Sequence, residues 1–313
     1  MYLVCGEALF DFFSVEPSPR NSEVEFKAVA GGSPFNVAIG LRRLGAESAL
    51  FTGISTDYFG LRLRRVLAEE GVADDYLIGS DAPTTLAMVG LNEQGSPHYS
   101  FRGEGCADRQ VASEHLPSLG AHVRGIHIGS YSLVVTPVAA TFLELVKAHH
   151  QQRLISYDPN VRLNPQPDIA LWRQSVETFI GYAHMIKVSD EDLELLYPEH
   201  DPYALVNSWL TERCQLIFLT RGKQGASVFS YQHGHWALPA AKVITRDTVG
   251  AGDTFQAALL AYLQRNQLDS PAALRTISRN QINTMLKLAV QASAITCSRT
   301  GPDLPFLAEV EGL

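Results

Sequence analysis

Residues 247–253, Asp-Thr-Val-Gly-Ala-Gly-Asp, combine two glycines with two aspartates and form the stretch of the chain best suited to chemistry. The apolar segment 241–245 before it is predicted to be a strand, and the apolar segment 254–263 after it a buried helix. A helix that begins here directs unpaired N–H groups and the positive end of its dipole at whatever lies in front, which favours a phosphate. Asp253 would lie beside that phosphate, where a carboxylate can accept the proton of an attacking hydroxyl.

The same residues also have a structural interpretation. A strand–turn–helix corner can hold an aspartate at this position as a helix cap with no catalytic role. A motif this short does not decide between a base and a cap. P-loop enzymes and dinucleotide dehydrogenases are disfavoured, because the chain lacks GxxxxGK[ST] and residues 250–255 lack the third glycine of GxGxxG.

The composition is that of a globular chain with an acidic balance. Its 313 residues, 46% of them hydrophobic, suffice for one large α/β domain or two smaller ones. The formal net charge of −8 disfavours a nucleic-acid partner, which requires a basic surface. We expect neither a membrane span nor a signal peptide, since no apolar run approaches the roughly 20 residues of a span and no basic leader precedes the first strand.

The cysteines indicate a reducing compartment. Cys5, Cys106, Cys214 and Cys297 lie far apart and form no C-x-x-C pair. We expect reduced thiols in a cytoplasmic protein rather than a disulfide framework or a zinc site.

A second glycine-rich segment, residues 31–45, carries clear helix signals. Ser33 is predicted to be the N-cap, Pro34 the first helical residue and Gly45 the C-terminal cap. Asn36, in the first turn, could direct its amide at a ligand in front of the helix. The alternative, a local hydrogen bond to the backbone, is the commoner role for such a residue.

Strands and helices alternate along much of the chain. Apolar strands are predicted at 2–5, 49–52, 125–129, 154–158, 184–188 and 216–220, and one of the intervening helices is predicted to be capped by Thr136. This alternation predicts a mostly parallel sheet with helices on both faces. Residues 84–91 and 98–102 predict a hairpin, which could pair with residues 14–30 as a small accessory sheet.

Polar or glycine residues follow the ends of these predicted strands. They are Asp11, Gly32, Asp158, Asn160, Ser189, Thr220 and Asp253. Ligands of open α/β sheets bind beyond the carboxyl ends of the strands, so we expect one shared cleft rather than scattered helix caps.

Three further features near this cleft keep two interpretations each. Residues 220–225 could hold nucleotide phosphate or ribose, or form a plain β-turn. Residues 189–192 could place Mg²⁺ through water, or form an ordinary capping box. Arg102 and Arg162 could bind substrate hydroxyls or phosphate, or form surface ion pairs.

Together these motifs resemble those of the ribokinase-like (pfkB) carbohydrate kinases, and among them the fructokinases in particular. The markers extend over nearly the whole chain: Gly6, Glu7 and Asp11, then 31–38, 53–60, 101–102 with 107–108, 157–162 with 171–172, 220–225 and 247–253. The resemblance implies a Rossmann-like sheet with a small β-sheet lid. The chain would then be a single kinase domain, 1–313, with the lid formed by inserts at about 12–30 and 84–102.

The resemblance also assigns roles to individual residues. It implies that Asp253 is the catalytic base and that the backbone of Gly250, Ala251 and Gly252 forms the anion hole for the transferring phosphate. It implies sugar contacts for Asp11, Gly32, Asn36, Arg102 and Arg162, and nucleotide contacts for Thr220, Gly222 and Gly225. Asp247 matches a position that helps some members hold a monovalent cation such as K⁺, and Asp192 could bind Mg²⁺ through water.

Two positions depart from the family pattern. Ser189 and Asp192 stand where the family has its Asn-x-x-Glu motif, which weakens the implied magnesium role. Gln291 stands where an Asn is frequent in the late nucleotide-side helix.

The implied activity is ATP-dependent transfer of the γ-phosphate to a primary hydroxyl of a sugar, with D-fructose expected and Mg²⁺ required. One alternative is a kinase for 2-keto-3-deoxygluconate or another sugar, whose acid group Arg102 and Arg162 could bind. The other is a non-catalytic nucleotide and sugar sensor on the same fold. We further expect small-molecule partners only, no membrane, and a homodimer through the lid by fold analogy.

Overall fold

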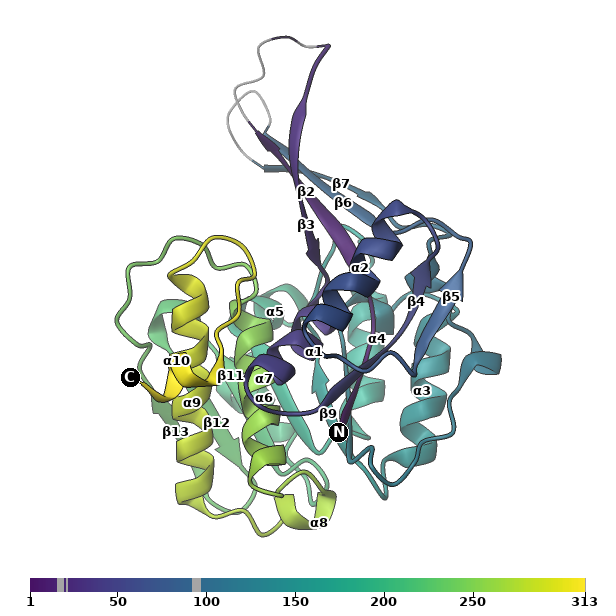
Figure 1. Cartoon of the computed structure of the whole chain (residues 1–313). Helices are drawn as coiled ribbons and strands as arrows, with labels where there is room; N and C mark the ends of the chain where they lie inside the picture. The colour runs from purple at the N-terminus through teal and green to yellow at the C-terminus, as the bar shows by residue number, and fades with distance from the viewer. Residues whose placement is uncertain (16–19, 21, 92–96, 313) are drawn as a thin grey trace.

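A nine-stranded sheet with helices on both faces forms the body of the protein (Figure 1). The computed structural model describes residues 1–15, 20, 22–91 and 97–312. The strand order is β13-β12-β11-β10-β9-β8-β1-β4-β5. The strands are β1 (Tyr2–Cys5), β4 (Ser48–Ser55), β5 (Leu77–Ser80), β8 (Gly125–Gly129), β9 (Leu154–Asp158), β10 (Met185–Ser189), β11 (Leu216–Thr220), β12 (Ala226–Ser230) and β13 (Gly234–Leu238). Only the pairings of β12 and β13 among these described strands are antiparallel, which confirms the mostly parallel sheet.

Helices cover this sheet in two groups. The α-helices are α1 (Ser33–Arg43), α2 (Tyr58–Glu69), α3 (Val138–His149), α4 (Ile169–Ile180), α5 (Asp190–Leu196), α6 (Pro202–Ser208), α7 (Ala251–Arg265), α8 (Pro271–Leu274), α9 (Arg279–Cys297) and α10 (Leu307–Glu311). Short 3₁₀ helices are η1 (Ala107–Arg109), η2 (Ser113–His115), η3 (Tyr131–Leu133) and η4 (Gly222–Gln224). In the described part of the chain, no helix has the length and apolar character needed to cross a membrane.

The parallel part of the sheet supplies side chains to two hydrophobic cores, one on each face. Leu154 and Met185 pack with α1, α2, α7 and α9, whereas their neighbours Ile155 and Ile186 pack with α3, α4, α5 and α6. This follows from the two-residue period of a strand. Because both faces are covered, these strands are apolar almost throughout.

A second sheet extends away from the main body (Figure 1). Its order is β3-β2-β6-β7, with β2 (Leu9–Val15), β3 (Glu25–Gly31), β6 (Leu86–Leu91) and β7 (Pro97–Arg102). The antiparallel pairing of β6 with β7 confirms the predicted hairpin, whose connecting residues 92–96 lie outside the described part. The parallel pairing of β2 with β6 joins this hairpin to β2 and β3, so the accessory sheet is confirmed.

Three local predictions were wrong. Residues 241–245 form no strand, because β13 is already the edge of the sheet and the segment runs exposed toward α7, with Ile244 85% exposed. Helix α1 is capped by Gly32 rather than Ser33, whose hydroxyl bonds elsewhere. Thr136 caps no helix either, because Pro137 occupies the position before α3.

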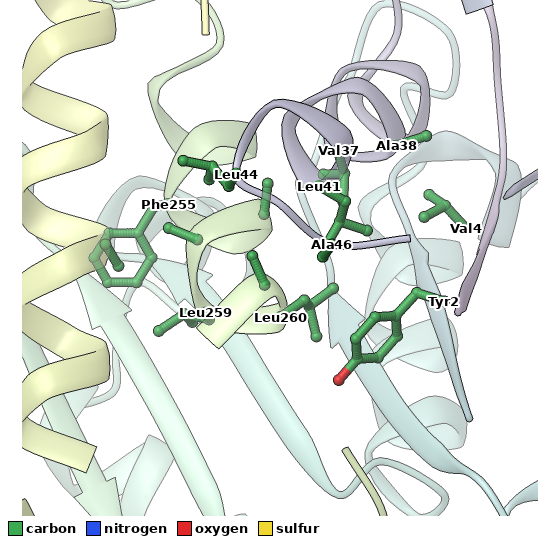
Figure 2. Packing of buried hydrophobic residues seen from close by; sticks show 14 of the residues in the cluster. Tyr2, Val4, Val37, Ala38, Leu41, Leu44, Ala46, Phe255, Leu259 and Leu260 are labelled. Atoms are coloured by element: carbon green, nitrogen blue, oxygen red, sulfur yellow. The ribbon is translucent and has the colours of Figure 1, made fainter. Parts of the chain in front are cut away.

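Helices α1 and α7 pack against each other through buried apolar side chains (Figure 2). A Cβ atom on Gly40 would lie only 2.7 Å from the Cβ atom of Ala257. Around this point Leu41 of α1, Leu44 at the C-terminal cap of that helix and Leu260 of α7 belong to one buried cluster. The small residues therefore fix the distance between the two helices whose first turns carry the candidate site.

We predict that Glu7 makes stability depend on pH. This side chain is 2% exposed and accepts a hydrogen bond from Ser132 Oγ (2.6 Å). Burial raises the Glu7 pKa to about 7, although hydrogen bonds from Ser130 and Ser132 oppose the rise. A raised carboxyl pKa contributes stability that is complete below the unfolded pKa of about 4.5 and is lost as pH rises through about 7.

The variant Glu7→Gln keeps an acceptor for Ser132 but cannot ionise. Its free energy of unfolding relative to wild type should therefore increase between pH 5 and pH 8, by up to about 3 kcal/mol. Urea denaturation across this range measures the difference. A difference that stays constant with pH would contradict the assignment.

Candidate active site

Asp253 lies in the first turn of α7, with its side chain 9% exposed. Gly250 precedes the helix with φ 78°, a left-handed conformation that glycine adopts without a steric penalty. Helix geometry leaves the N–H groups of Gly252 and Asp253 without an acceptor inside α7, at the positive end of its dipole. The N–H of Ala251 differs from the expectation, because it donates to the Thr248 carbonyl oxygen (3.2 Å). The free amides at the predicted anion hole therefore include those of Gly252 and Asp253 but not that of Ala251.

The Asp253 carboxylate is held by two residues of α1. Ser33 Oγ donates to its Oδ1 at 2.6 Å, and Asn36 Nδ2 donates to its Oδ2 at 2.8 Å. Asp253 is thus not a helix cap, and the cap position of α7 belongs to Gly250. The alternative interpretation of Asn36, a local bond to the backbone, does not describe its amide, which bonds this carboxylate. Two donors from one helix fix the orientation of a carboxylate on another.

Asp11 faces the same space from the second sheet. It lies within β2, opposite Val29 of β3, so the expectation that it follows a strand end was wrong. A Cβ atom on Gly31 would lie 2.5 Å from Asp11 Oδ2, which shows that this glycine makes room for the carboxylate. Burial raises the Asp11 pKa to about 6; the Arg162 guanidinium opposes the rise and the Asp253 charge adds to it.

These electrostatic interactions bring Asp11, Arg162 and Asp253 into one group. Gly32, the N-cap of α1, precedes Ser33 and has φ 106°. A Cβ atom on Gly32 would lie 2.7 Å from the Glu7 carbonyl oxygen. Arg102 is the last residue of β7 and is exposed. Among the described residues it has no interaction with this group, so the structure unites the predicted sugar contacts except for Arg102.

The predicted nucleotide residues form a tight connection between β11 and β12. Thr220 ends β11, Gly222 begins η4 with φ 45°, and Gly225 has φ 91°. A side chain on Gly225 would clash with the Leu238 carbonyl oxygen of β13. Both glycines are thus required by the backbone, and their role in nucleotide binding stays a prediction.

The carboxylates predicted near metal ions accept hydrogen bonds from the protein. Asp192 forms the predicted capping box with Ser189, and its Oδ1 also accepts from the Val161 N–H (2.8 Å). Asp247 Oδ2 accepts from the Gly301 N–H (2.8 Å). Three or more His, Cys, Asp or Glu side chains arranged for a metal ion are not found within the described ranges. A carboxylate oxygen can accept more than one hydrogen bond, so a water-mediated role for Asp192 fits this geometry.

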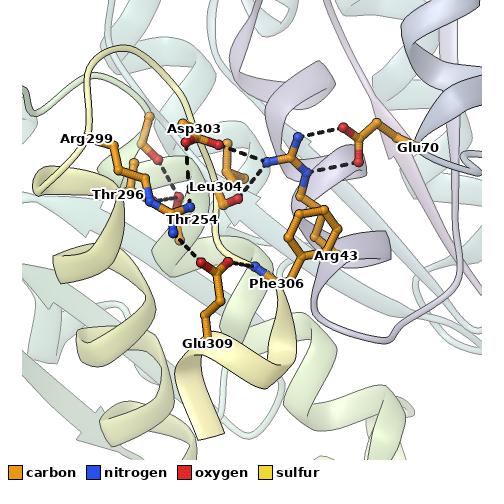
Figure 3. Close-up of polar contacts among 10 residues, drawn as sticks. Arg43, Glu70, Thr254, Thr296, Arg299, Asp303, Leu304, Phe306 and Glu309 are labelled. Carbon is orange, nitrogen blue, oxygen red and sulfur yellow. Dashed lines mark hydrogen bonds and ion pairs between the residues drawn. The ribbon is translucent and has the colours of Figure 1, made fainter. Parts of the chain in front are cut away.

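An ion pair of Arg43 with Asp303 (3.2 Å) holds the segment after α9 against α1 (Figure 3). Arg43 of α1 donates two hydrogen bonds to the Glu70 carboxylate (2.6 and 2.9 Å) and one to the Leu304 carbonyl oxygen (2.6 Å). The same segment places Pro302 beside the turn, where a Cβ atom on Gly250 would lie 2.8 Å from its Cβ. Pro302 therefore packs against the turn at Gly250 and limits its movement.

Sequence reasoning missed one buried cation near this group, Lys187. It lies in β10, is 3% exposed, and its Nζ donates to Asp158 Oδ2 at 2.9 Å. The signal was available, because a lysine inside an otherwise apolar strand, next to a strand that ends in an aspartate, indicates a buried ion pair.

The family model described as pfkB family carbohydrate kinase matches residues 1–308. The chain belongs to this family. This confirms the resemblance drawn from the motifs, and the protein is a phosphotransferase with a sugar hydroxyl as acceptor.

Individual relatives agree with the family assignment. A fructokinase of Rhizobium leguminosarum bv. trifolii is 36% identical over 271 residues, covering 86% of this kinase and 81% of its own chain. Fructokinase-2 of Solanum habrochaites is 31% identical over 312 residues, covering 97% and 93%. The crystal structure of fructokinase with bound ATP from Xylella fastidiosa has a TM-score of 0.88 and 27% identity, covering 99% of this kinase and 96% of that chain.

The Asp11 pKa predicts an acid limb in the activity of this kinase. As pH falls through about 6, Asp11 becomes protonated and loses acceptor capacity for sugar hydroxyls, so kcat/KM for the sugar should fall. In Asp11→Asn, kcat/KM should be lower than in wild type above about pH 6, and this limb should be absent. The exposed Asp75→Asn provides a matched control that keeps the wild-type profile. An unchanged acid limb in Asp11→Asn would show that another group causes it.

Proposed function

We propose that this kinase transfers the γ-phosphate of ATP to a primary hydroxyl of D-fructose. The observation that carries the proposal is the Asp253 carboxylate, held by Ser33 and Asn36 beside the free N–H groups at the start of α7. The fructokinases among its relatives support the choice of sugar, and the ATP bound in the Xylella fastidiosa enzyme supports the choice of donor.

The proposed reaction has one base and one anion hole. The sugar hydroxyl oxygen attacks the γ-phosphorus while Asp253 accepts its proton, the bond to the β-phosphate oxygen breaks, and ADP leaves. The N–H groups of Gly252 and Asp253, on the turn formed by Gly250 and Ala251, stabilise charge on the transferring phosphoryl oxygens. Because these donors are part of the helix start, they need no rearrangement during the reaction.

The charges around the sugar site favour a neutral substrate. Asp11 and Asp253 contribute two carboxylates, and the Arg162 cation interacts with Asp11. A sugar acid such as 2-keto-3-deoxygluconate would meet more negative than positive charge here, which disfavours it. We propose that Asp11, Gly32, Asn36, Arg162 and Arg102 bind the hydroxyls of a neutral sugar.

The remaining assignments concern nucleotide and ions. We propose that Thr220, Gly222 and Gly225 contact the nucleotide. Mg²⁺, which would arrive with ATP and keep most of its water, would neutralise phosphate charge, with Asp192 bonding its hydration shell. Asp247, where two loops meet through its bond to Gly301, is the proposed monovalent-cation position for K⁺.

The second sheet is proposed to act as a lid over a single kinase domain, 1–313. The sheet carries Asp11 on β2 and Arg102 on β7, within the inserts 12–30 and 84–102 or next to them. Closure over the sugar would exclude water and limit hydrolysis of ATP. Its outer strand β3 is an unpaired edge among the described strands, which supports a homodimer through the lid. The free thiols of all four cysteines support a cytoplasmic location.

The catalytic role of Asp253 predicts a selective loss of turnover. Asp253→Asn retains the shape and the bond to Ser33 but cannot accept the proton, so kcat should fall by about 10²–10⁴-fold. ATP affinity, measured by calorimetry, should change little. Ser33→Ala, which removes only one orienting bond, should lose less activity. Turnover near the wild-type rate in Asp253→Asn would remove this residue from the mechanism.

The choice of sugar has its own test. ADP release is measured in a coupled spectrophotometric assay with a panel of D-fructose, D-glucose, D-ribose and 2-keto-3-deoxygluconate. We expect kcat/KM to be highest for D-fructose. A higher kcat/KM for the sugar acid would overturn the proposed substrate. Sugar binding without any ADP release would indicate a sensor instead of a kinase.

A further inference from the structure

A column of buried polar side chains lies below the start of α7. Gln256 Nε2 of α7 donates to Ser156 Oγ of β9 (2.8 Å), which lies 3.2 Å from His127 Nδ1 of β8. All three side chains are almost completely buried. Among the described residues Gln256 Oε1 has no hydrogen-bond partner, and burying an unsatisfied polar atom is unfavourable, so stability alone does not explain this column.

Lys187 is the charged member of this region and lies against the anion hole. Strand β10 points Met185 and Lys187 to the same face of the sheet, the face covered by α7. A Cβ atom on Gly252 would lie 3.1 Å from Lys187 Nζ. The ammonium group is therefore immediately behind the main chain of Gly252, whose N–H is free at the helix start.

The surroundings keep Lys187 charged. Burial opposes the charge, but the carboxylates of Asp158, Asp192 and Asp253 outweigh it and raise the Lys187 pKa. Burial and the nearby ammonium lower the His127 pKa to about 3, so that imidazole is neutral at pH 7. Lys187 is thus the cation that faces these three carboxylates from the sheet side.

The pair of Lys187 with Asp158 is poorly explained by stability alone. A buried ion pair seldom stabilises a fold more than apolar residues of the same volume would. Within the described part of the chain Asp158 Oδ1 has no hydrogen-bond partner, so the pair also leaves one buried oxygen unsatisfied. A role at the adjacent anion hole would explain why this buried ion pair is present.

We propose that Lys187 is a positioning residue for phosphoryl transfer, fixing the main chain of Gly252 and supplying positive charge behind the anion hole. Three carboxylates interact with Lys187 next to a site that must receive a polyanionic phosphoryl group, and their negative charges repel that group. The ammonium group offsets one of these charges without entering the substrate space. The inference rests on the proposed function only in requiring phosphoryl transfer at this site, whichever sugar is the acceptor.

The test compares Lys187→Met with Lys147→Met, the same change at an exposed position on α3. With the sugar that wild type phosphorylates best, Lys187→Met should lower kcat about 10–100-fold and leave KM for the sugar within about threefold. Binding of ADP with aluminium fluoride and the sugar, which mimics the transferring phosphoryl group, should weaken by a similar factor, while ADP alone binds as before. Equal kcat in the two variants, or equal weakening of ADP and of the mimic, would overturn the proposal.

A second variant guards against misfolding, since Lys187→Met leaves Asp158 buried without its counter-ion. Asp158→Asn combined with Lys187→Met removes both charges and should restore the melting temperature, yet kcat should stay low. Recovery of wild-type kcat in this double variant would mean that Lys187 serves only to neutralise Asp158. If wild type itself releases no ADP with any sugar, it is the proposed function that fails, and weakened binding of the mimic still tests Lys187 separately.

Discussion

The candidate site depends on how closely α1 packs against α7. Both helices begin at the same edge of the sheet, and Gly40 of α1 meets Ala257 of α7 where a larger residue would force them apart. This contact sets the reach between Asn36 and Asp253, whose side chains meet at 2.8 Å. Adding even one methyl group at this contact would separate the helices and lengthen that bond, because tightly packed cores transmit strain.

Electrostatics impose the second constraint on the site. A kinase of this kind must gather carboxylates for proton transfer and sugar binding, yet accept phosphate beside them. In the proposed mechanism positive elements meet both needs: the dipole and free N–H groups of α7, Arg162 beside Asp11, and Lys187 beneath Gly252. Burial strengthens the interactions of Lys187, because less water screens them, whereas Arg162 is exposed.

Much of the fold was predictable because it is encoded locally. Each buried parallel strand is a short apolar run between turn signals. The turn at Gly250 and Gly252 can be predicted from its two glycines. The segment 241–245 has similar composition but no neighbouring strand to pair with, and composition alone does not reveal that. Local rules also assigned Ser33 to a cap, although its partner Asp253 lies 220 positions away.

What sequence reasoning lacked was the pairing of distant residues. The proposed role of Lys187 depends on its contacts with Asp158 and Gly252. These three residues lie in β10, β9 and α7, which are far apart in the sequence. Asp11 likewise gains its role from Gly31 on the neighbouring strand, which leaves room for its carboxylate. The structure therefore reveals the groups of residues that are close in space but far apart in the sequence.

The central claim is that a hydroxyl and a phosphate meet between the Asp253 carboxylate and the start of α7. A crystal structure with D-fructose and a non-hydrolysable ATP analogue tests it most directly. The account predicts the primary hydroxyl oxygen at about 2.6–3.2 Å from an Asp253 carboxylate oxygen, with the γ-phosphate facing the Gly252 N–H. A sugar bound with every hydroxyl beyond hydrogen-bond reach of Asp253, or a γ-phosphate held away from α7, would contradict it.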